Sequence, residues 1–395
     1  MKYRILFLLT LVLSLWSCGQ SEFKLTTETT AQANVIASME LTEKLKTTPF
    51  KLIAQTSEGK SEIPFQIDGS MIYWKTPAEN AEYSIVLETA SIMEPIQMME
   101  NEGQLEIYQN NTKVVGYQMA VQDVPEGVDP AYKRSGYLHP VNTPKGKRLT
   151  QIQPEDHYHH YGIWNPWTHT VFEGDTLDFW NLRSKQGTVR FAKLLEKNTG
   201  PVFGEFEVLH EHVVLKGEEE KIALNENQQI KVIPIDNHQY LLDIKITYQC
   251  ATDEAFSIIE YRYGGFGWRT TEEWDNQNSR VLSSEGNTRK NADGSTARWC
   301  IVEGKLDEGR GGALMLSHPE NYNHPEPLRV WPEDQYGRGD LFVNFATTKN
   351  TDWTFHPGEE YVLQYRLLVF DGTMDESSAE EAWKQFAKPL VYTLK

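Results

Sequence analysis

Three neighbouring runs, FGEFEVLHEHVVL (203–215), QIKVIPI (229–235) and YLLDIKITYQC (240–250), indicate the fold class. In the third run the apolar residues Leu242, Ile244 and Ile246 alternate with the polar residues Asp243 and Lys245. A period of two places the apolar side chains on one face of a strand and the polar ones on the other. The runs therefore predict long antiparallel strands with one buried face.

Similar short β-rich runs, bounded by glycine and proline turns, continue along most of the chain. They are PFKLIAQT (49–56), SMIYWK (70–75), YSIVLET (83–89), QLEIYQ (104–109), KVVGYQM (113–119), TVRFAKLLE (188–196), FSIIEYRYGGFGW (256–268), GALMLSH (312–318), DLFVNFAT (340–347) and YVLQYRLLVF (361–370). One helical pattern is clear, SSAEEAWKQF (377–386), with Ser377 or Ser378 as its cap. We predict an all-β protein: a large antiparallel β-sandwich with a small N-terminal β module and a short C-terminal helix.

The first residues predict export. Lys2 and Arg4 precede the apolar run 5–13, which is too short to span a membrane, and LWSC (15–18) resembles a bacterial lipoprotein box. We expect residues 1–17 to be a signal peptide and Cys18 to carry a lipid that anchors the protein in the bacterial envelope, at the periplasmic or surface face of the outer membrane. The alternative is secretion without a lipid.

The rest of the chain divides by composition. Polar, threonine-rich residues 18–30 predict a tether, residues 31–95 a small β module, and residues 104–395 the sandwich domain. The polar segment 96–103 marks the boundary between the two.

Charge and cysteine content exclude several classes of protein. Removal of Lys2 and Arg4 with the signal leaves 36 basic and 56 acidic residues, a net charge of −20. Such a chain is poorly suited to binding nucleic acid. Cys250 and Cys300 could form one disulfide, but they are too few for a disulfide scaffold or a cysteine-based zinc site.

Four of the eleven histidines lie in YLHPVNTPKGKRLTQIQPEDHYHHYGIWNPW (137–167), which proline and glycine break into turns. If residues 156–161 are extended, His157 and His159 project to one face and His160 to the other. His157 and His159 could then bind a divalent metal, Zn²⁺ or Ca²⁺, with His139 as the nearest further ligand.

The same loop could work by proton transfer without a metal. Imidazoles titrate near neutral pH, and Asp156 or Glu155 could orient one of the rings. The structural alternative is a loop of hydrogen-bonded histidines stacked on Trp164 and Trp167.

Three later blocks contribute further candidate residues. EYRYGGFGWR (260–269), SSEGNTRKNADGSTARW (283–299) and HPENYNHPEPLRVW (318–331) combine charged side chains with aromatic rings in turn-rich sequence. The candidates are Glu260, Tyr263, Arg269, Glu285, Arg289, Arg298, Trp299, His318, His324 and Arg329. Each block also has a structural alternative, such as a solvated hairpin tip. The motifs of serine hydrolases, P-loop proteins and common zinc proteases are not present.

Several of these pieces resemble the PmoA-like family of exported proteins, which carries a "methane oxygenase" label and whose function is unknown. They are EGVDPAYKRSGYLHPVNTPKG (126–146), DHYHHYGIW (156–164), NTGPVFGE (198–205), YGGFGWR (263–269), SSEGNTRK and ARW (283–299), and HPENYNHP and VW (318–331). The resemblance covers residues 104–372 and implies a β-supersandwich like that of galactose mutarotases, with genes among carbohydrate-degradation clusters. The family often has a basic residue where this chain has Tyr161.

The combined interpretation is an exported carbohydrate-active enzyme that processes oligosaccharides by β-elimination. We expect His157 or His160, with His159 beside them, to remove the α-proton, Arg289 or Arg298 to stabilise the enolate, and His139 or His318 to protonate the leaving oxygen. We expect substrate to contact Trp164, Trp167, Tyr263, Arg269, Trp299, His324 and Arg329. The alternatives are a glycoside hydrolase that uses Glu260 or Glu285, with or without the assistance of a metal, and a non-catalytic glycan-binding lipoprotein.

Overall fold

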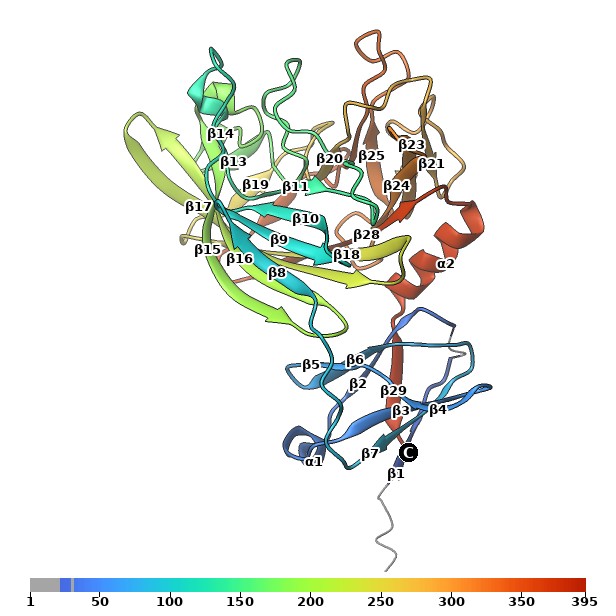
Figure 1. Cartoon of the computed structure of the whole chain (residues 1–395). Helices are drawn as coiled ribbons and strands as arrows, with labels where there is room; N and C mark the ends of the chain where they lie inside the picture. Colours follow the sequence, from blue (N-terminus) through green and yellow to red (C-terminus); the bar gives the residue numbers. More distant parts are fainter. Residues whose placement is uncertain (1–21, 30–31) are drawn as a thin grey trace, which may run out of the picture.

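The computed structural model describes residues 22–29 and 32–395, which form a small β unit beneath a larger β-sandwich (Figure 1). The predicted signal peptide and Cys18 lie outside the described residues. The predicted strand alternation is present: in β18 (Gln239–Cys250), Leu242, Ile244 and Ile246 are buried while Lys245 is exposed. The all-β sandwich and the C-terminal helix are confirmed.

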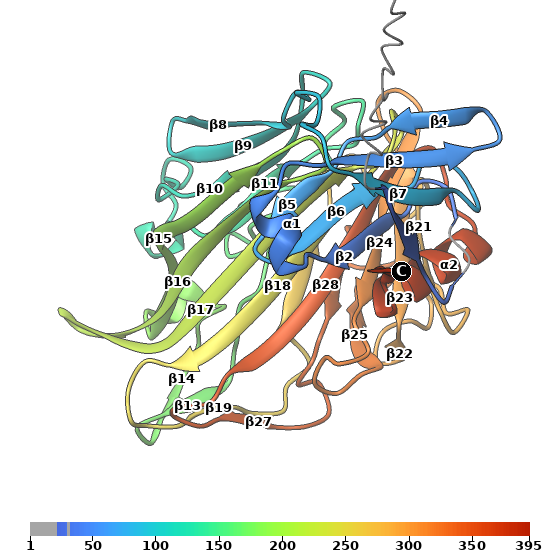
Figure 2. The same cartoon turned by 90° about the horizontal axis from the view of Figure 1, so that it is seen from below.

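Two large antiparallel sheets make the sandwich. Figure 2 shows the strands of the eight-stranded sheet side by side, from β15 to β21. The eight-stranded sheet has the order β15 (Gly187–Thr199), β16 (Gly204–Lys216), β17 (Glu219–Pro234), β18, β28 (Tyr361–Asp371), β24 (Arg310–Ser317), β23 (Trp299–Lys305), β21 (Ser279–Ser283). The nine-stranded sheet has the order β22 (Thr296–Ala297), β25 (Glu326–Val330), β26 (Phe342–Phe345), β20 (Phe266–Arg269), β12 (Ile163–Trp164), β11 (Tyr137–Val141), β10 (Thr112–Gln118), β9 (Gln104–Gln109), β8 (Gln97–Asn101). Their facing apolar side chains form the main core.

A four-stranded sheet extends this core. Its order is β14 (Asp175–Leu177), β13 (Thr170–Phe172), β19 (Phe256–Ile258), β27 (Trp353–Phe355). Phe172, Ile258 and Phe355 from it pack into the main core. Short 3₁₀ turns at Pro130–Tyr132 and Leu182–Ser184 lie in two of the loops that precede β11 and β15.

The small unit contains strands from both ends of the chain. Its order is β4 (Gly59–Glu62), β3 (Lys51–Thr56), β7 (Glu82–Val86), β1 (Glu22–Thr26), β29 (Leu390–Leu394), β2 (Ile36–Glu40), β6 (Met71–Lys75), β5 (Gln66–Asp68), with helix α1 (Glu43–Thr47) beside it. The β29 strand, red in Figure 1, lies among the blue strands and pairs in parallel with β2. The ring of Tyr392 contacts Trp74 and Tyr83.

Three predicted boundaries therefore change. Residues 22–26 of the predicted tether form β1, because Leu25 is buried in the small core and Phe23 packs against it. Residues 390–394 leave the predicted sandwich domain to complete the small unit, because Leu390 and Tyr392 are buried there. Residues 97–101, predicted as boundary, form β8 of the nine-stranded sheet.

Helix α2 (Glu376–Ala387) begins one residue before the predicted range 377–386, and its cap is not Ser377 or Ser378. Asp375 is its N-cap and accepts a hydrogen bond from the Ser378 amide at 2.8 Å. Ala379 and Phe386 pack against Trp299, Leu314 and Leu316 of the eight-stranded sheet. Cys250 and Cys300 are both free thiols. Within the described residues no helix is long and apolar enough to cross a membrane.

An ionisable cluster is buried between the two large sheets. Glu226 on β17 accepts hydrogen bonds from His212 at 2.7 Å and His210 at 3.2 Å, and Tyr117 of the facing sheet contacts His210. Burial favours the neutral carboxyl, but the histidine hydrogen bonds outweigh it and hold the pKa of Glu226 well below its ordinary value. Burial lowers the pKa of His212, although Glu226 opposes this.

This cluster predicts acid lability. Both folded-state pKa values lie below their unfolded values, so the stabilisation is complete above about pH 6.5 and is lost as the pH falls, first through His212 and then through Glu226. We expect Glu226→Gln to lower the free energy of unfolding at pH 7 by about 3 kcal/mol and to flatten its decline below pH 4.5. Urea unfolding between about pH 2.5 and pH 8 measures both effects. The exposed control Glu254→Gln should match the wild type, and an equal decline in Glu226→Gln would contradict this account.

Candidate functional site

Three predicted histidines, His157, His159 and His160, meet on the face of the nine-stranded sheet that points away from the main core. Residues 154–160 are not extended: the His157 amide donates to the Pro154 carbonyl at 2.9 Å, and the His160 amide donates to the His157 carbonyl at 3.0 Å. These turns bring His160 to the same side as the other two, contrary to the predicted alternation. One ring nitrogen of each histidine lies within 4.8 Å of those of the other two. We call this cluster the histidine triad.

The triad combines one fully buried ring with two half-buried ones. His160 is 1% exposed, and its Nδ1 has no hydrogen-bond partner. Burial and the neighbouring His159 hold the pKa of His160 well below its ordinary value. Burial, with His157 nearby, lowers the pKa of His159 to about 4. His159 and His160 are therefore neutral at physiological pH, with lone pairs available as ligands or acceptors.

A polar chain fixes the third ring. Asp156 accepts a hydrogen bond from Nδ1 of His157 at 2.8 Å, and Nη2 of Arg269 lies 3.2 Å from both carboxylate oxygens of Asp156. Burial alone would raise the pKa of Asp156, but the hydrogen bond from His157 and the charge of Arg269 outweigh it and lower that pKa. With Nδ1 committed to Asp156, Nε2 of His157 is the acceptor. The Tyr336 hydroxyl donates to it at 3.1 Å.

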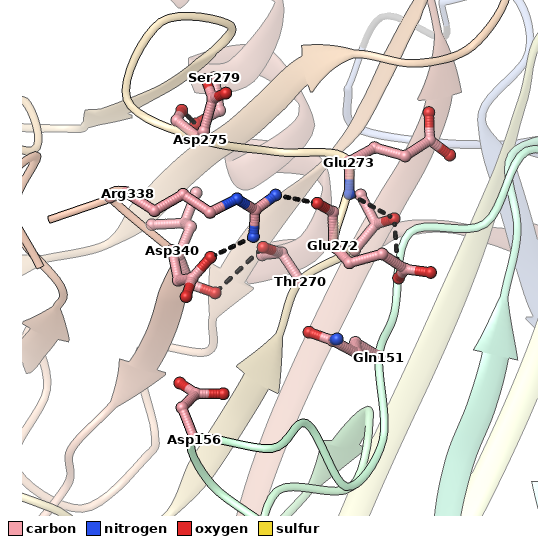
Figure 3. Close-up of polar contacts among 12 residues, drawn as sticks. Gln151, Asp156, Thr270, Glu272, Glu273, Asp275, Ser279, Arg338 and Asp340 are labelled. Atoms are coloured by element: carbon pink, nitrogen blue, oxygen red, sulfur yellow. Dashed lines mark hydrogen bonds and ion pairs between the residues drawn. The ribbon is translucent and has the colours of Figure 1, made fainter. Parts of the chain in front are cut away.

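Further charged side chains lie near Asp156, and Figure 3 shows two of them, Asp340 and Arg338. Asp340 lies 3.7 Å from Nη2 of Arg269, and Arg338 joins Asp340 to the backbone carbonyl of Glu272. Arg269 itself is 2% exposed and stacks over the Trp331 ring, so it holds Asp156 from beneath and does not face solvent.

Aromatic rings form the wall behind the triad. The His160 ring centroid lies 5.2 Å from that of Trp164, 5.1 Å from Phe342 and 5.6 Å from Trp331. Trp164 and Trp331 are at most 3% exposed. The predicted sugar-stacking role of Trp164 is thus replaced by a packing role, and Trp167, fully buried in the main core, has the same role there. The accessible aromatic groups at the site are tyrosines, Tyr336 above all at 58% exposed.

Arg289 holds the loop that carries Tyr336. Its buried guanidinium donates to the carbonyl oxygens of Trp331, Pro332, Gly339 and Asp340. Every one of these acceptors lies in or beside the 332–340 loop. The structure therefore places Arg289 as a positioning residue, not as the enolate-stabilising group predicted from sequence.

The remaining predicted catalytic residues lie outside the triad. Nδ1 of His139 is hydrogen-bonded to Thr150 at 2.9 Å, and burial lowers the pKa of His139 to about 4, so this ring is committed elsewhere. Glu260 and Glu285 are both exposed. The Glu260 backbone amide donates to the Asp352 carboxylate, and the Glu285 carboxylate accepts from the Ser284 hydroxyl.

A second group of predicted residues packs against helix α2. His318 contacts Phe386, and His324 stacks on Trp383. Arg298 and Trp299 both donate to the Glu380 carboxylate at 2.9 Å. These four residues fasten the helix to the sandwich, Arg298 and Trp299 through hydrogen bonds to Glu380 and the two histidines through ring contacts.

Tyr263 and Arg329 do adjoin the site. The Tyr263 hydroxyl accepts hydrogen bonds from Arg329 at 3.0 Å and from Trp331 at 3.1 Å, and Arg329 also pairs with Asp293 at 2.6 Å. Both are half-buried.

Sequence reasoning gave no role to several residues that the fold brings to the triad. Tyr132 stacks on His159, Trp180 packs against Trp164, and Tyr336 contacts His157. These side chains come from separate loops, and no spacing in the sequence links them. The one available signal was the position of Tyr336 directly after the HPENYNHPEPLRVW block.

The chain belongs to a protein family of unknown function, DUF6807, which it matches over residues 104–384. The matched region contains the sandwich apart from its edge strand β8, and it contains the histidine triad. No curated protein matches the chain. A crystal structure of a heparan sulfate lyase HepC mutant from Pedobacter heparinus is similar over 73% of this chain, with 9% sequence identity and a TM-score of 0.34. The chain covers 38% of that lyase's length, and similarity of this extent assigns no activity.

The positioning role of Arg289 is testable. Arg289→Ala leaves several buried carbonyls without a donor, so we expect the free energy of unfolding to fall by about 3 kcal/mol. We also expect faster amide exchange, concentrated in residues 331–340. Hydrogen exchange followed by mass spectrometry locates the effect. The exposed neighbour Lys290→Ala is the matched control, and unchanged exchange at 331–340 in Arg289→Ala would refute the role.

Proposed function

We propose that this protein is an exported carbohydrate-active enzyme that cleaves acidic oligosaccharides by β-elimination at the histidine triad. The observation that carries this proposal is the chain Asp156–His157–Tyr336, which ends in a largely exposed phenol. An aligned carboxylate, imidazole and hydroxyl form a proton-transfer unit, as elimination requires. The carbohydrate substrate and the envelope location rest on the sequence resemblance and on the predicted lipidation of Cys18.

The geometry gives each group a role. Asp156 fixes His157 with Nε2 towards Tyr336, so that Tyr336 is the group that reaches the substrate. Nε2 of His157 accepts the Tyr336 hydroxyl proton, and the resulting phenolate takes the proton α to the sugar carboxylate. The electrons of that C–H bond form the new C=C bond as the β C–O bond breaks, and the phenol then protonates the leaving oxygen. Arg269 keeps Asp156 ionised and in place throughout.

Metal-assisted hydrolysis is the second candidate, and the histidine triad favours it because converging imidazoles are suited to holding an ion that activates water. Hydrolysis by Glu260 and Glu285 lacks such support, because the structure gives the two carboxyls no shared partner. A purely glycan-binding role is also less favoured, since the tryptophans that would stack on sugars are buried.

The experiment is incubation of the purified protein with uronate-containing oligosaccharides, followed by mass and by ultraviolet absorbance of the products. We expect a product with a new double bond and no added water. Tyr336→Phe should lower kcat by about 100- to 10,000-fold with a smaller change in KM, because a proton-transfer group is removed while the ring remains.

Tyr158→Phe is the matched control, because Tyr158 lies among the triad histidines, is half-buried and packs on Tyr132. It should retain the wild-type rate. Products that have gained water would move the assignment to hydrolysis. Binding of oligosaccharides without any product, in both the wild type and Tyr336→Phe, would overturn the enzyme proposal.

A further inference from the structure

We propose that His157, His159 and His160 bind one divalent transition-metal ion, of the class of Zn²⁺. This inference deepens the proposed function at the same site, because an ion there would supply the positive charge that stabilises an enolate. Metal binding can nevertheless be measured without any substrate.

The three histidines offer a metal ion nitrogen ligands only. Three imidazoles offer nitrogen atoms within 4.8 Å of one another, and the cluster contains no carboxylate ligand. Imidazole suits Zn²⁺ and its neighbours in the first transition series, whereas Ca²⁺ prefers six or more oxygen ligands. Of the two metals considered from the sequence, the geometry favours Zn²⁺. Three protein ligands leave a fourth position for water or substrate, as catalytic zinc sites require.

The second argument is the unpartnered nitrogen of His160. This ring is 1% exposed, and its Nδ1 has no hydrogen-bond partner. A buried polar atom left unsatisfied costs about 1–3 kcal/mol. Aromatic side chains surround the ring, including Trp164 and Phe342, and no hydrogen bond joins any protein group to that nitrogen. The ring of His160 therefore carries a nitrogen that no protein group uses, as a ligand of an ion requires.

The third argument is the support behind His157. The Asp156 carboxylate accepts from Nδ1 at 2.8 Å, which leaves Nε2 as the ligand atom. Such a carboxylate behind a ligating imidazole fixes its orientation and raises its basicity. Asp156 is in turn held by the buried Arg269. The support for a metal ligand is therefore already assembled around His157.

Small side-chain movements complete the site. Zinc at ~2.1 Å from each nitrogen needs nitrogens about 3.4 Å apart. His160 is enclosed, so the half-buried rings of His157 and His159 make the adjustment. Tyr336 then exchanges its hydrogen bond with His157 for a position beside the ion. With metal bound, Nε2 of His157 is a ligand, and the ion replaces it as the group that favours the Tyr336 phenolate: the positive charge promotes loss of the hydroxyl proton to water, and the phenolate then takes the α-proton.

The test is titration of the metal-free protein, prepared without a histidine tag, with Zn²⁺ by calorimetry and with Co²⁺ by visible absorption. We expect one equivalent to bind, with the intense absorption of four-coordinate Co²⁺. His159→Ala should weaken binding by about 100-fold or more. Asp156→Asn keeps all three ligands and should weaken it by about 10- to 100-fold. The exposed His238→Ala is the matched control and should bind as the wild type does.

Folding is checked by thermal unfolding of each variant, with and without Zn²⁺. Zinc should raise the Tm of the wild type and of His238→Ala but not that of His159→Ala, because only bound ligand stabilises the fold. Absence of binding by the wild type, or equal affinity in His159→Ala, would overturn the inference and leave a triad that holds water. Binding of the metal without elimination would overturn only the proposed function.

Discussion

The ion pair between Arg269 and Asp156 is the contact on which the candidate site depends. Arg269 ends strand β20, and Asp156 begins the turn that carries the three histidines. Because the guanidinium is buried against Trp331, it needs a carboxylate partner, and this requirement fixes where the turn lies on the sheet. The turn in turn aims His157 at Tyr336 and sets His160 against the aromatic wall. Rigid strands thus position groups that the loop alone could not hold.

The charged residues discussed above have two kinds of role: some stabilise the scaffold, and others form the candidate site. Arg289 binds backbone carbonyls, Arg298 fastens helix α2, and Glu226 with its two histidines lies sealed between the sheets. These groups maintain the scaffold. The Asp156–His157–Tyr336 chain and His159, which lie beside the buried His160, combine convergence with access to solvent. A charged residue or a histidine therefore indicates a catalytic site only when its contacts in the structure are known.

Much of the fold was predictable because each strand carries its own signal. In β18, the buried residues Leu242, Ile244 and Ile246 alternate with more polar ones, and this pattern predicts a strand without any knowledge of its neighbours. The predicted domain boundaries were wrong where a strand carries no such local signal. Strand β1 is five residues long in threonine-rich sequence, and β29 joins strands more than 300 residues away in the chain, so neither is visible locally.

The site was predictable only in part for the same reason. His157, His159 and His160 lie together in sequence, so their proximity was expected. The turns that bring all three rings to one side depend on backbone hydrogen bonds to the Pro154 and His157 carbonyls and on the ion pair between Arg269 and Asp156. Tyr336 comes from a distant loop held by Arg289.

The central claim is that the triad is a site where chemistry takes place around a bound ion. The most direct measurement is a crystal structure of the zinc-soaked protein with anomalous diffraction recorded on both sides of the zinc absorption edge. This account predicts one strong anomalous peak, ~2.1 Å from a nitrogen of each of His157, His159 and His160. A triad with ordinary water density and no anomalous peak would contradict it.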